Sequence, residues 1–235
     1  MKSGARRQVF LLLAGLAVLL AVLARGPESG AVQLLLRVAV VAVSLLAWFR
    51  TQAMIGARAP VGGIGDALHD WTEPWNDWLQ ARPRVADGVL RVSSLFIDAF
   101  GLFLLAAGIF GESLRPFVGL LLLFLFRQLC QGLCALPPPP KMIWRHPGFP
   151  SLLVTYGVSS DFFISGHTAI AVLGAIEVAR VLPVWAAVLA GLVAVGEAVT
   201  VIVLRAHYTM DVLAAVVAAW CAADLAWRLS LWLSL

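Results

Sequence analysis

Two short polar strings in this apolar sequence carry residues that can do chemistry on phosphorus. His167 follows Ser165-Gly166 at the start of one apolar segment, and His207 lies four residues before Asp211 at the start of another. On a helix, residues i and i+4 share a face, so Asp211 can accept the Nδ1 proton of His207 and leave Nε2 free to attack. The pattern indicates nucleophilic catalysis with a second histidine nearby.

The second histidine, His167, has the position of a general acid. Ser165 predicts an N-cap, and the free backbone N–H groups behind it form an anion site. A phosphate bound at Ser165-Gly166 would meet these donors together with His167, which can protonate a departing alkoxide. The residues alone leave two non-enzymatic alternatives open, a haem held between the two histidines and a transporter.

The rest of the chain has the composition of a membrane protein. Of its 235 residues 61% are hydrophobic and 13% charged, and seven apolar segments recur along it, each near the length needed to cross about 30 Å of hydrocarbon. Because backbone groups in lipid must be satisfied internally, we expect an all-α, polytopic membrane helical bundle of six to seven transmembrane spans. The segments are Val9–Ala24 (which partly resembles a signal peptide), Ala31–Phe49, Val89–Phe110, Leu114–Leu136, Gly166–Leu182, Val184–Leu204 and Met210–Leu233.

We expect a single integral membrane domain over residues 1–235. Residues 1–50 form N-terminal spans, 51–88 an interfacial connection, and 89–235 the catalytic helical core. Within the connection, Ile64–Ala81 is rich in tryptophan, which favours the headgroup region, so we predict a helix or turn along the interface. Its tryptophans could also hold a choline cation.

Other polar residues are candidates for binding a phosphate or headgroup. Arg127 lies inside an apolar segment, where a charge is costly, and is the best candidate for a phosphate clamp. Lys141 and Arg145 lie in the proline-rich connection that precedes the segment with His167. Asp161 lies four residues before Ser165, and Tyr208 follows His207. No metal or cofactor is indicated.

Two glutamates, Glu177 and Glu197, also lie inside apolar segments, ten residues from a motif histidine. Ten helical residues span about 15 Å, too far for direct contact. We expect each to form an ion pair inside the bundle, for example with Arg37 or Arg91. The remaining interpretations are a base for an acceptor hydroxyl and the lining of a lipid chamber.

Longer strings resemble a known family. Asp161-Phe-Phe-Ile-Ser-Gly-His-Thr168 and His207-Tyr-Thr-Met-Asp-Val212 resemble the signature motifs of the sphingomyelin synthase-like branch of the type-2 phosphatidic acid phosphatase (PAP2) superfamily. Phe126-Arg-Gln-Leu-Cys130, running to Leu136-Pro-Pro-Pro-Pro140, looks like that family's arginine-bearing helix, and Gly65-Asp-Ala-Leu-His-Asp70 faintly resembles its earliest motif. The resemblance covers roughly residues 65–220.

This resemblance implies a lipid phosphotransferase that works through a phosphohistidine on His207. Its partners would be a phospholipid donor and a lipid alcohol such as ceramide as acceptor. With water as acceptor, the same site would give phospholipase C-like or lipid phosphate phosphatase hydrolysis. Basic residues at the ends of spans are expected of any membrane protein, so the net charge of +4 indicates no nucleic-acid role. The charge comes almost wholly from arginine, and this usage leads us to expect a multi-pass protein of a bacterial inner membrane. The positive-inside rule favours a cytoplasmic active site and the resemblance an exoplasmic one.

Overall fold

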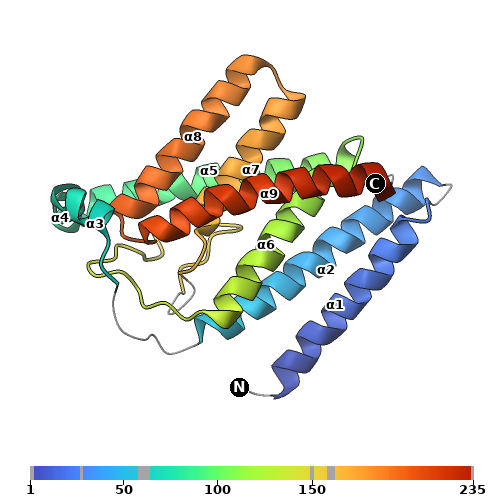
Figure 1. The fold of residues 1–235 in the computed structure, drawn as a ribbon, viewed down its shortest axis with the longest axis horizontal. Coiled ribbons are helices and arrows are strands. Elements are labelled where there is room, and N and C mark those ends of the chain that lie inside the picture. Colours follow the sequence, from blue (N-terminus) through green and yellow to red (C-terminus); the bar gives the residue numbers. More distant parts are fainter. Residues whose placement is uncertain (1–2, 27–28, 58–63, 149–150, 158–161, 234–235) are drawn as a thin grey trace.

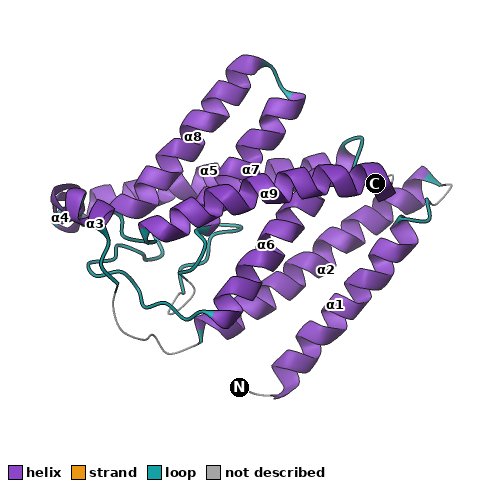
Figure 2. Ribbon diagram, viewed as in Figure 1, coloured by secondary structure: helices purple, strands orange, loops and turns teal. Residues whose placement is uncertain are grey.

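The computed structural model describes residues 3–26, 29–57, 64–148, 151–157 and 162–233, and over these ranges it contains helices and no strands (Figure 2). The predicted all-α fold is confirmed, with each long helix close to a predicted apolar segment. In chain order the helices are α1 (Ser3–Leu23), α2 (Gly30–Gly56), α3 (Ala67–Trp71), α4 (Glu73–Gln80), α5 (Pro83–Phe110), α6 (Arg115–Leu133), α7 (Gly166–Val181), α8 (Val184–Val203) and α9 (Thr209–Leu233).

Five helices are long and apolar enough to cross a membrane within the described part of the chain: α2, α5, α6, α8 and α9. The protein is therefore a multi-pass integral membrane protein, although the predicted count of six to seven spans exceeds these five. The difference lies in α1, whose apolar part is Arg7–Leu23, and in α7, which has 16 residues. At 1.5 Å per residue α7 is about 24 Å long, short of the hydrocarbon thickness.

Helix α7 packs against α5, α6, α8 and α9, and so lies at the centre of the bundle. Small residues let its neighbours approach closely: a Cβ on Gly119 of α6 would lie 3.4 Å from Leu173 of α7 and 3.6 Å from Ala226 of α9. Close approach at small residues is how membrane helices gain van der Waals contact. In Figure 1 the α7–α8 and α1–α2 hairpins project from opposite sides of the body.

The two buried glutamates differ in their partners. Glu177 of α7 forms ion pairs with Arg115 at 2.9 Å and Arg180 at 2.6 Å, so it pairs inside the bundle as predicted, although with arginines other than Arg37 and Arg91. Glu197 of α8 instead accepts a hydrogen bond from the Ser93 hydroxyl at 2.6 Å, and no ion pair involves it among the described residues.

The two longer connections, between α2 and α5 and between α6 and α7, lie at the same end of the bundle as the turn between α8 and α9 (Figures 1 and 2). The predicted interfacial segment forms α3 and α4, and Trp71, Trp75 and Trp78 are exposed there, as expected for a headgroup-level surface. The longer connection between α6 and α7 is irregular where it is described. Both connections pack near the starts of α7 and α9, which carry the histidine motifs.

Candidate active site

Two residues directly before α7, Ile164 and Ser165, set the conformation of its first turn. Ser165 is the N-cap, as predicted, and its side chain accepts a hydrogen bond from the Thr168 N–H at 3.3 Å. Ile164 is fully buried with φ of +64°, a conformation that β-branched residues rarely adopt. Such strain clusters at functional sites, where the surrounding structure holds it in place. The turn that follows carries His167 into the interior, with 6% of its surface exposed.

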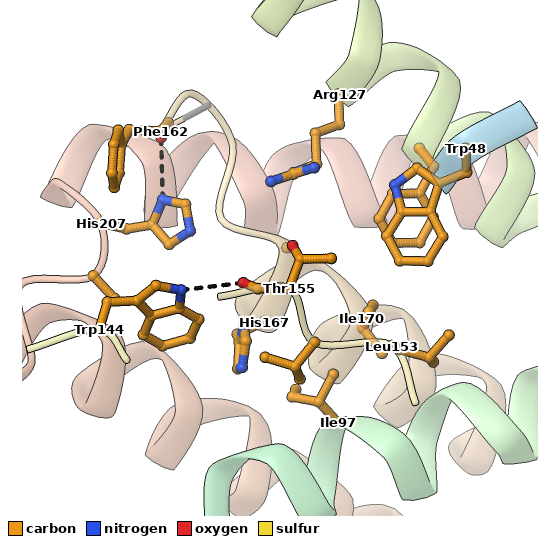
Figure 3. Close-up of a pocket in the computed structure, with 14 residues that line it drawn as sticks. Trp48, Ile97, Arg127, Trp144, Leu153, Thr155, Phe162, His167, Ile170 and His207 are labelled. Atoms are coloured by element: carbon orange, nitrogen blue, oxygen red, sulfur yellow. Dashed lines mark hydrogen bonds between the residues drawn. The ribbon is translucent and has the colours of Figure 1, made fainter. Parts of the chain in front are cut away.

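His207 lies in the tight turn between α8 and α9. Its Nδ1 is 3.1 Å from the backbone carbonyl oxygen of Phe162 and 3.5 Å from Oδ2 of Asp211. Because a carbonyl only accepts, Nδ1 carries the proton and Nε2 keeps its lone pair. Figure 3 shows this second nitrogen turned away from Phe162, toward the space between Arg127 and His167. A backbone carbonyl that the sequence did not point to thus makes the closer contact to Nδ1.

Asp211 has a second task besides its contact with His207. The side chain is fully buried, and its Oδ2 accepts a hydrogen bond from the Tyr208 N–H at 3.0 Å. Its backbone carbonyl accepts one from the Ser165 N–H at 3.1 Å. Asp211 therefore closes the turn that holds His207 and joins this turn to the start of α7.

Arg127 of α6 is 6% exposed, and its guanidinium reaches the start of α7. Its Nε donates to the Ile164 carbonyl at 3.0 Å and its Nη1 to Oε1 of Gln52 at 2.7 Å. A Cβ added to Gly166 would lie 3.7 Å from Nε, so the guanidinium sits directly beside the N-terminus of α7. A cation and free backbone N–H groups thus lie side by side, an arrangement suited to an anion.

These side chains border one small cavity of about 40 Å³, lined by Arg127, Gly166, His167 and His207 among others (Figure 3). Such a volume holds a few water molecules. Aromatic rings make up much of the remaining wall, from Trp48 of α2, Phe124 of α6, and Trp144 and Phe162 of the connection. The Trp144 ring meets the His167 ring edge-on at 5.0 Å between centroids. Because Trp48 and Gln52 belong to α2, this N-terminal helix contributes to the site.

The faint motif at residues 65–70 holds the His207 turn from outside. His69 is 3% exposed, and its Nε2 donates to the His207 carbonyl at 2.9 Å, while its own carbonyl accepts from Arg205 at 3.0 Å. Asp66 accepts from the backbone N–H and the hydroxyl of Thr209. Burial raises the pKa of Asp66, but the Thr209 hydrogen bonds and nearby His69 outweigh it and hold the pKa below its ordinary value. The tie is therefore ionised at neutral pH.

The structure does not bring every predicted binding residue to the cavity. Lys141 pairs with Glu73 and Asp77, at 2.8 and 2.9 Å, on the surface. Arg145 pairs with Asp87 at 2.8 Å. Tyr208 is fully buried but stacks on His69, with 5.6 Å between ring centroids, on the far side of the turn. Asp161 lies outside the described residues.

Taken together, a multi-pass helical bundle holds two buried histidines and an arginine around a cavity, close to its two longer connections. A model of the AtPDCT1/2 family matches residues 66–228, and the chain belongs to this family of phosphatidylcholine:diacylglycerol cholinephosphotransferases. Membership places the protein among lipid phosphotransferases. Comparison with curated proteins and with solved structures finds no match.

The family match corrects the identification made from short motifs. The sphingomyelin synthase-like branch of the PAP2 superfamily was the wrong family, because the model that matches, over more than two thirds of the chain, is that of AtPDCT1/2. The strings around His167 and His207 that carried the resemblance are a few residues long. Strings of that length can recur in unrelated families, because similar sites arise on different folds.

Proposed function

We propose that the protein transfers a phosphocholine headgroup from phosphatidylcholine to diacylglycerol through a covalent phosphohistidine on His207. One observation carries the proposal. His207, with Nδ1 occupied and Nε2 directed to the cavity, lies across it from His167 and beside Arg127. The family supplies the lipid substrates. A phosphodiester anion would supply the negative charge that this basic cavity attracts.

In the first half of the reaction, Nε2 of His207 attacks phosphorus. The N–P bond forms while the bond from phosphorus to the glycerol oxygen breaks, and His167, protonated when the phosphodiester anion binds, gives its proton to that oxygen and becomes neutral. Arg127 and the N–H groups at the start of α7 stabilise the charge on the phosphoryl oxygens. Diacylglycerol leaves and phosphocholine stays on His207.

In the second half, the hydroxyl of another diacylglycerol gives its proton to His167 and its oxygen attacks phosphorus. The N–P bond breaks, and His207 returns to its starting state. Water could take the place of the hydroxyl and turn transfer into hydrolysis. The cavity holds a few water molecules and must widen to admit a headgroup, and its aromatic wall keeps bulk water away from the phosphohistidine, which favours transfer.

Aromatic rings in the cavity suit the choline cation better than the exposed tryptophans of α3 and α4. A quaternary ammonium binds over aromatic faces, most strongly where water is excluded. Trp48, Phe124 and Trp144 line the cavity, whereas Trp78 already stacks under Arg82 at 4.6 Å. We therefore assign choline recognition to the cavity rings and membrane anchoring to the exposed tryptophans.

Headgroup exchange between two labelled lipids tests this function. Purified protein in nanodiscs receives phosphatidylcholine with a deuterated choline and diacylglycerol with distinct odd-chain acyl groups. We expect mass spectrometry to find deuterated choline on the odd-chain lipid. Release of free phosphocholine would show a hydrolase, and transfer to added ceramide in preference to diacylglycerol would show a different acceptor. Either result would contradict the proposal.

We also propose that the protein lies in a bacterial inner membrane. The support is its arginine-rich composition, in which Lys2 and Lys141 are the two lysines among 17 basic residues. The multi-pass helices and the lipid-enzyme family fit any membrane equally well.

Replacing Asp211 by asparagine should lower the exchange rate by about tenfold. The Phe162 carbonyl keeps the His207 tautomer and an amide oxygen can still accept from the Tyr208 N–H, so what is lost is the carboxylate charge 3.5 Å from Nδ1. That charge stabilises the imidazolium character that develops on attack. The measurement is kcat for exchange, with circular dichroism to check folding. A loss of about 10⁴-fold would show that Asp211, and not Phe162, sets the tautomer.

A further inference from the structure

A second, larger hollow lies between α5 and α8, away from the catalytic cavity. Its volume is about 930 Å³, and its walls include Val92 and Phe96 of α5 and Leu189 and Leu192 of α8. All four side chains are more than 40% exposed, so the groove opens sideways onto the surface that faces lipid. It is long-walled and apolar, which suits acyl chains.

The groove has a polar spot at its floor. Glu197 is 3% exposed and lines the groove, and its Oε2 accepts a hydrogen bond from the Ser93 hydroxyl at 2.6 Å. No hydrogen bond to Oε1 is found in the described part of the chain, and no arginine or lysine lines the groove. A carboxyl group placed in lipid without a cation is costly, which marks it as functional.

The polar spot is connected to the catalytic cavity through one turn of α5. Ser93 lines the groove, and Ile97, one turn further on, lines the catalytic cavity. Between them, Ser94 is hydrogen-bonded to the Tyr156 hydroxyl at 2.5 Å. The Tyr156 ring packs on Trp144 at 5.0 Å, and Trp144 in turn meets His167. Ser94, Tyr156 and Trp144 therefore form a series of side chains in contact that leads from the α5 side of the groove to His167.

We propose that the groove between α5 and α8 binds a neutral lipid with a free hydroxyl, of the diacylglycerol class, which hydrogen-bonds to Glu197 and Ser93. The assignment of this lipid as the acceptor, held here before it enters the catalytic cavity, rests on the proposed function; the hydroxyl must leave Glu197 before it attacks phosphorus, because Glu197 is too far from His207 for direct contact. A phospholipid would bring its phosphate to a carboxyl group with no cation beside it, which disfavours the donor here. A neutral lipid lacks a headgroup and can place its hydroxyl below headgroup level, and Glu197 lies inside a candidate membrane span, six residues before its end.

Two glycines of α8 provide a matched pair of variants. Gly196 lines the groove and Gly191 does not, and a Cβ at either position meets nothing within 4 Å. Leucine is a better helix former than glycine, so both Gly196→Leu and Gly191→Leu should fold. Gly196→Leu fills the groove, and we expect it to raise the apparent KM for diacylglycerol about tenfold and to leave that for phosphatidylcholine unchanged. Gly191→Leu should behave as wild type.

Photolabelling reads out binding without turnover. A diacylglycerol with a diazirine in one acyl chain is irradiated with His207→Ala protein in nanodiscs, and labelled peptides are mapped by mass spectrometry. We expect label on residues 85–96 and 189–200, lost when Gly196→Leu or Glu197→Leu is added and kept when Gly191→Leu is added. Label elsewhere, equal competition by phosphatidylcholine, or equal behaviour of the two glycine variants would overturn the groove proposal. Label in the groove with no headgroup transfer by the wild type would overturn the proposed function alone.

Discussion

His207→Ala is expected to abolish headgroup exchange, lowering the rate by at least about 10⁴-fold. The substitution removes the nitrogen that attacks phosphorus. Among the described residues that line the cavity, the other histidine is His167, which enters from α7 and packs edge-on against Trp144. Rate is measured as transfer of labelled phosphocholine between phosphatidylcholine and diacylglycerol. With wild-type protein, acid-labile label from the headgroup should also appear on the protein within one turnover, and the labelled peptide should contain His207.

A control histidine separates this chemistry from a general effect of losing an imidazole. His146 is exposed and its Nδ1 accepts a hydrogen bond from the Gly148 N–H at 3.1 Å, and it does not line the cavity. His146→Ala should therefore keep nearly full exchange. A His207→Ala protein with substantial activity, or wild-type protein labelled at another residue, would show that His207 is not the nucleophile.

Most of the helical framework could be predicted from the sequence, because a span leaves a long apolar run that can be read without knowing its neighbours. The positions of Ser165 and Asp211 were equally readable, since capping and i,i+4 spacing are local. Helix α7 has 16 residues, fewer than any of the five candidate spans. Its count as a span stays a prediction.

The parts of the site that could not be predicted depend on contacts between distant residues. Gln52 of α2 meets Arg127 across 75 positions, and His69 meets the His207 carbonyl across 138. The contact of His207 with the Phe162 carbonyl could not be predicted from side-chain types, because every residue carries a backbone carbonyl. The charge of Lys141 did not indicate its ion pairs, because the partners Glu73 and Asp77 lie in another connection.

His167→Ala should give a different defect, which depends on the leaving group. If His167 protonates the departing glycerol oxygen, its loss should slow exchange by about 10²- to 10⁴-fold with natural phosphatidylcholine. A substrate whose leaving group departs without a proton should escape the defect. p-Nitrophenyl phosphocholine is such a substrate, because p-nitrophenolate is stable in water. We expect His167→Ala to form the phosphoenzyme from it at close to the wild-type rate, measured as a burst of p-nitrophenolate by stopped-flow absorbance.

The same substrate distinguishes the two histidines. His207→Ala should release neither p-nitrophenolate nor diacylglycerol in a burst, because the nucleophile is missing. His167→Ala should lose the diacylglycerol burst from phosphatidylcholine and keep the p-nitrophenolate burst. A His167→Ala protein equally slow with both substrates would give this residue a positioning role. The edge-on contact with Trp144 at 5.0 Å would then explain the defect as a displaced cavity wall. Selective recovery would instead assign proton transfer to His167 and leave the attack on phosphorus to His207.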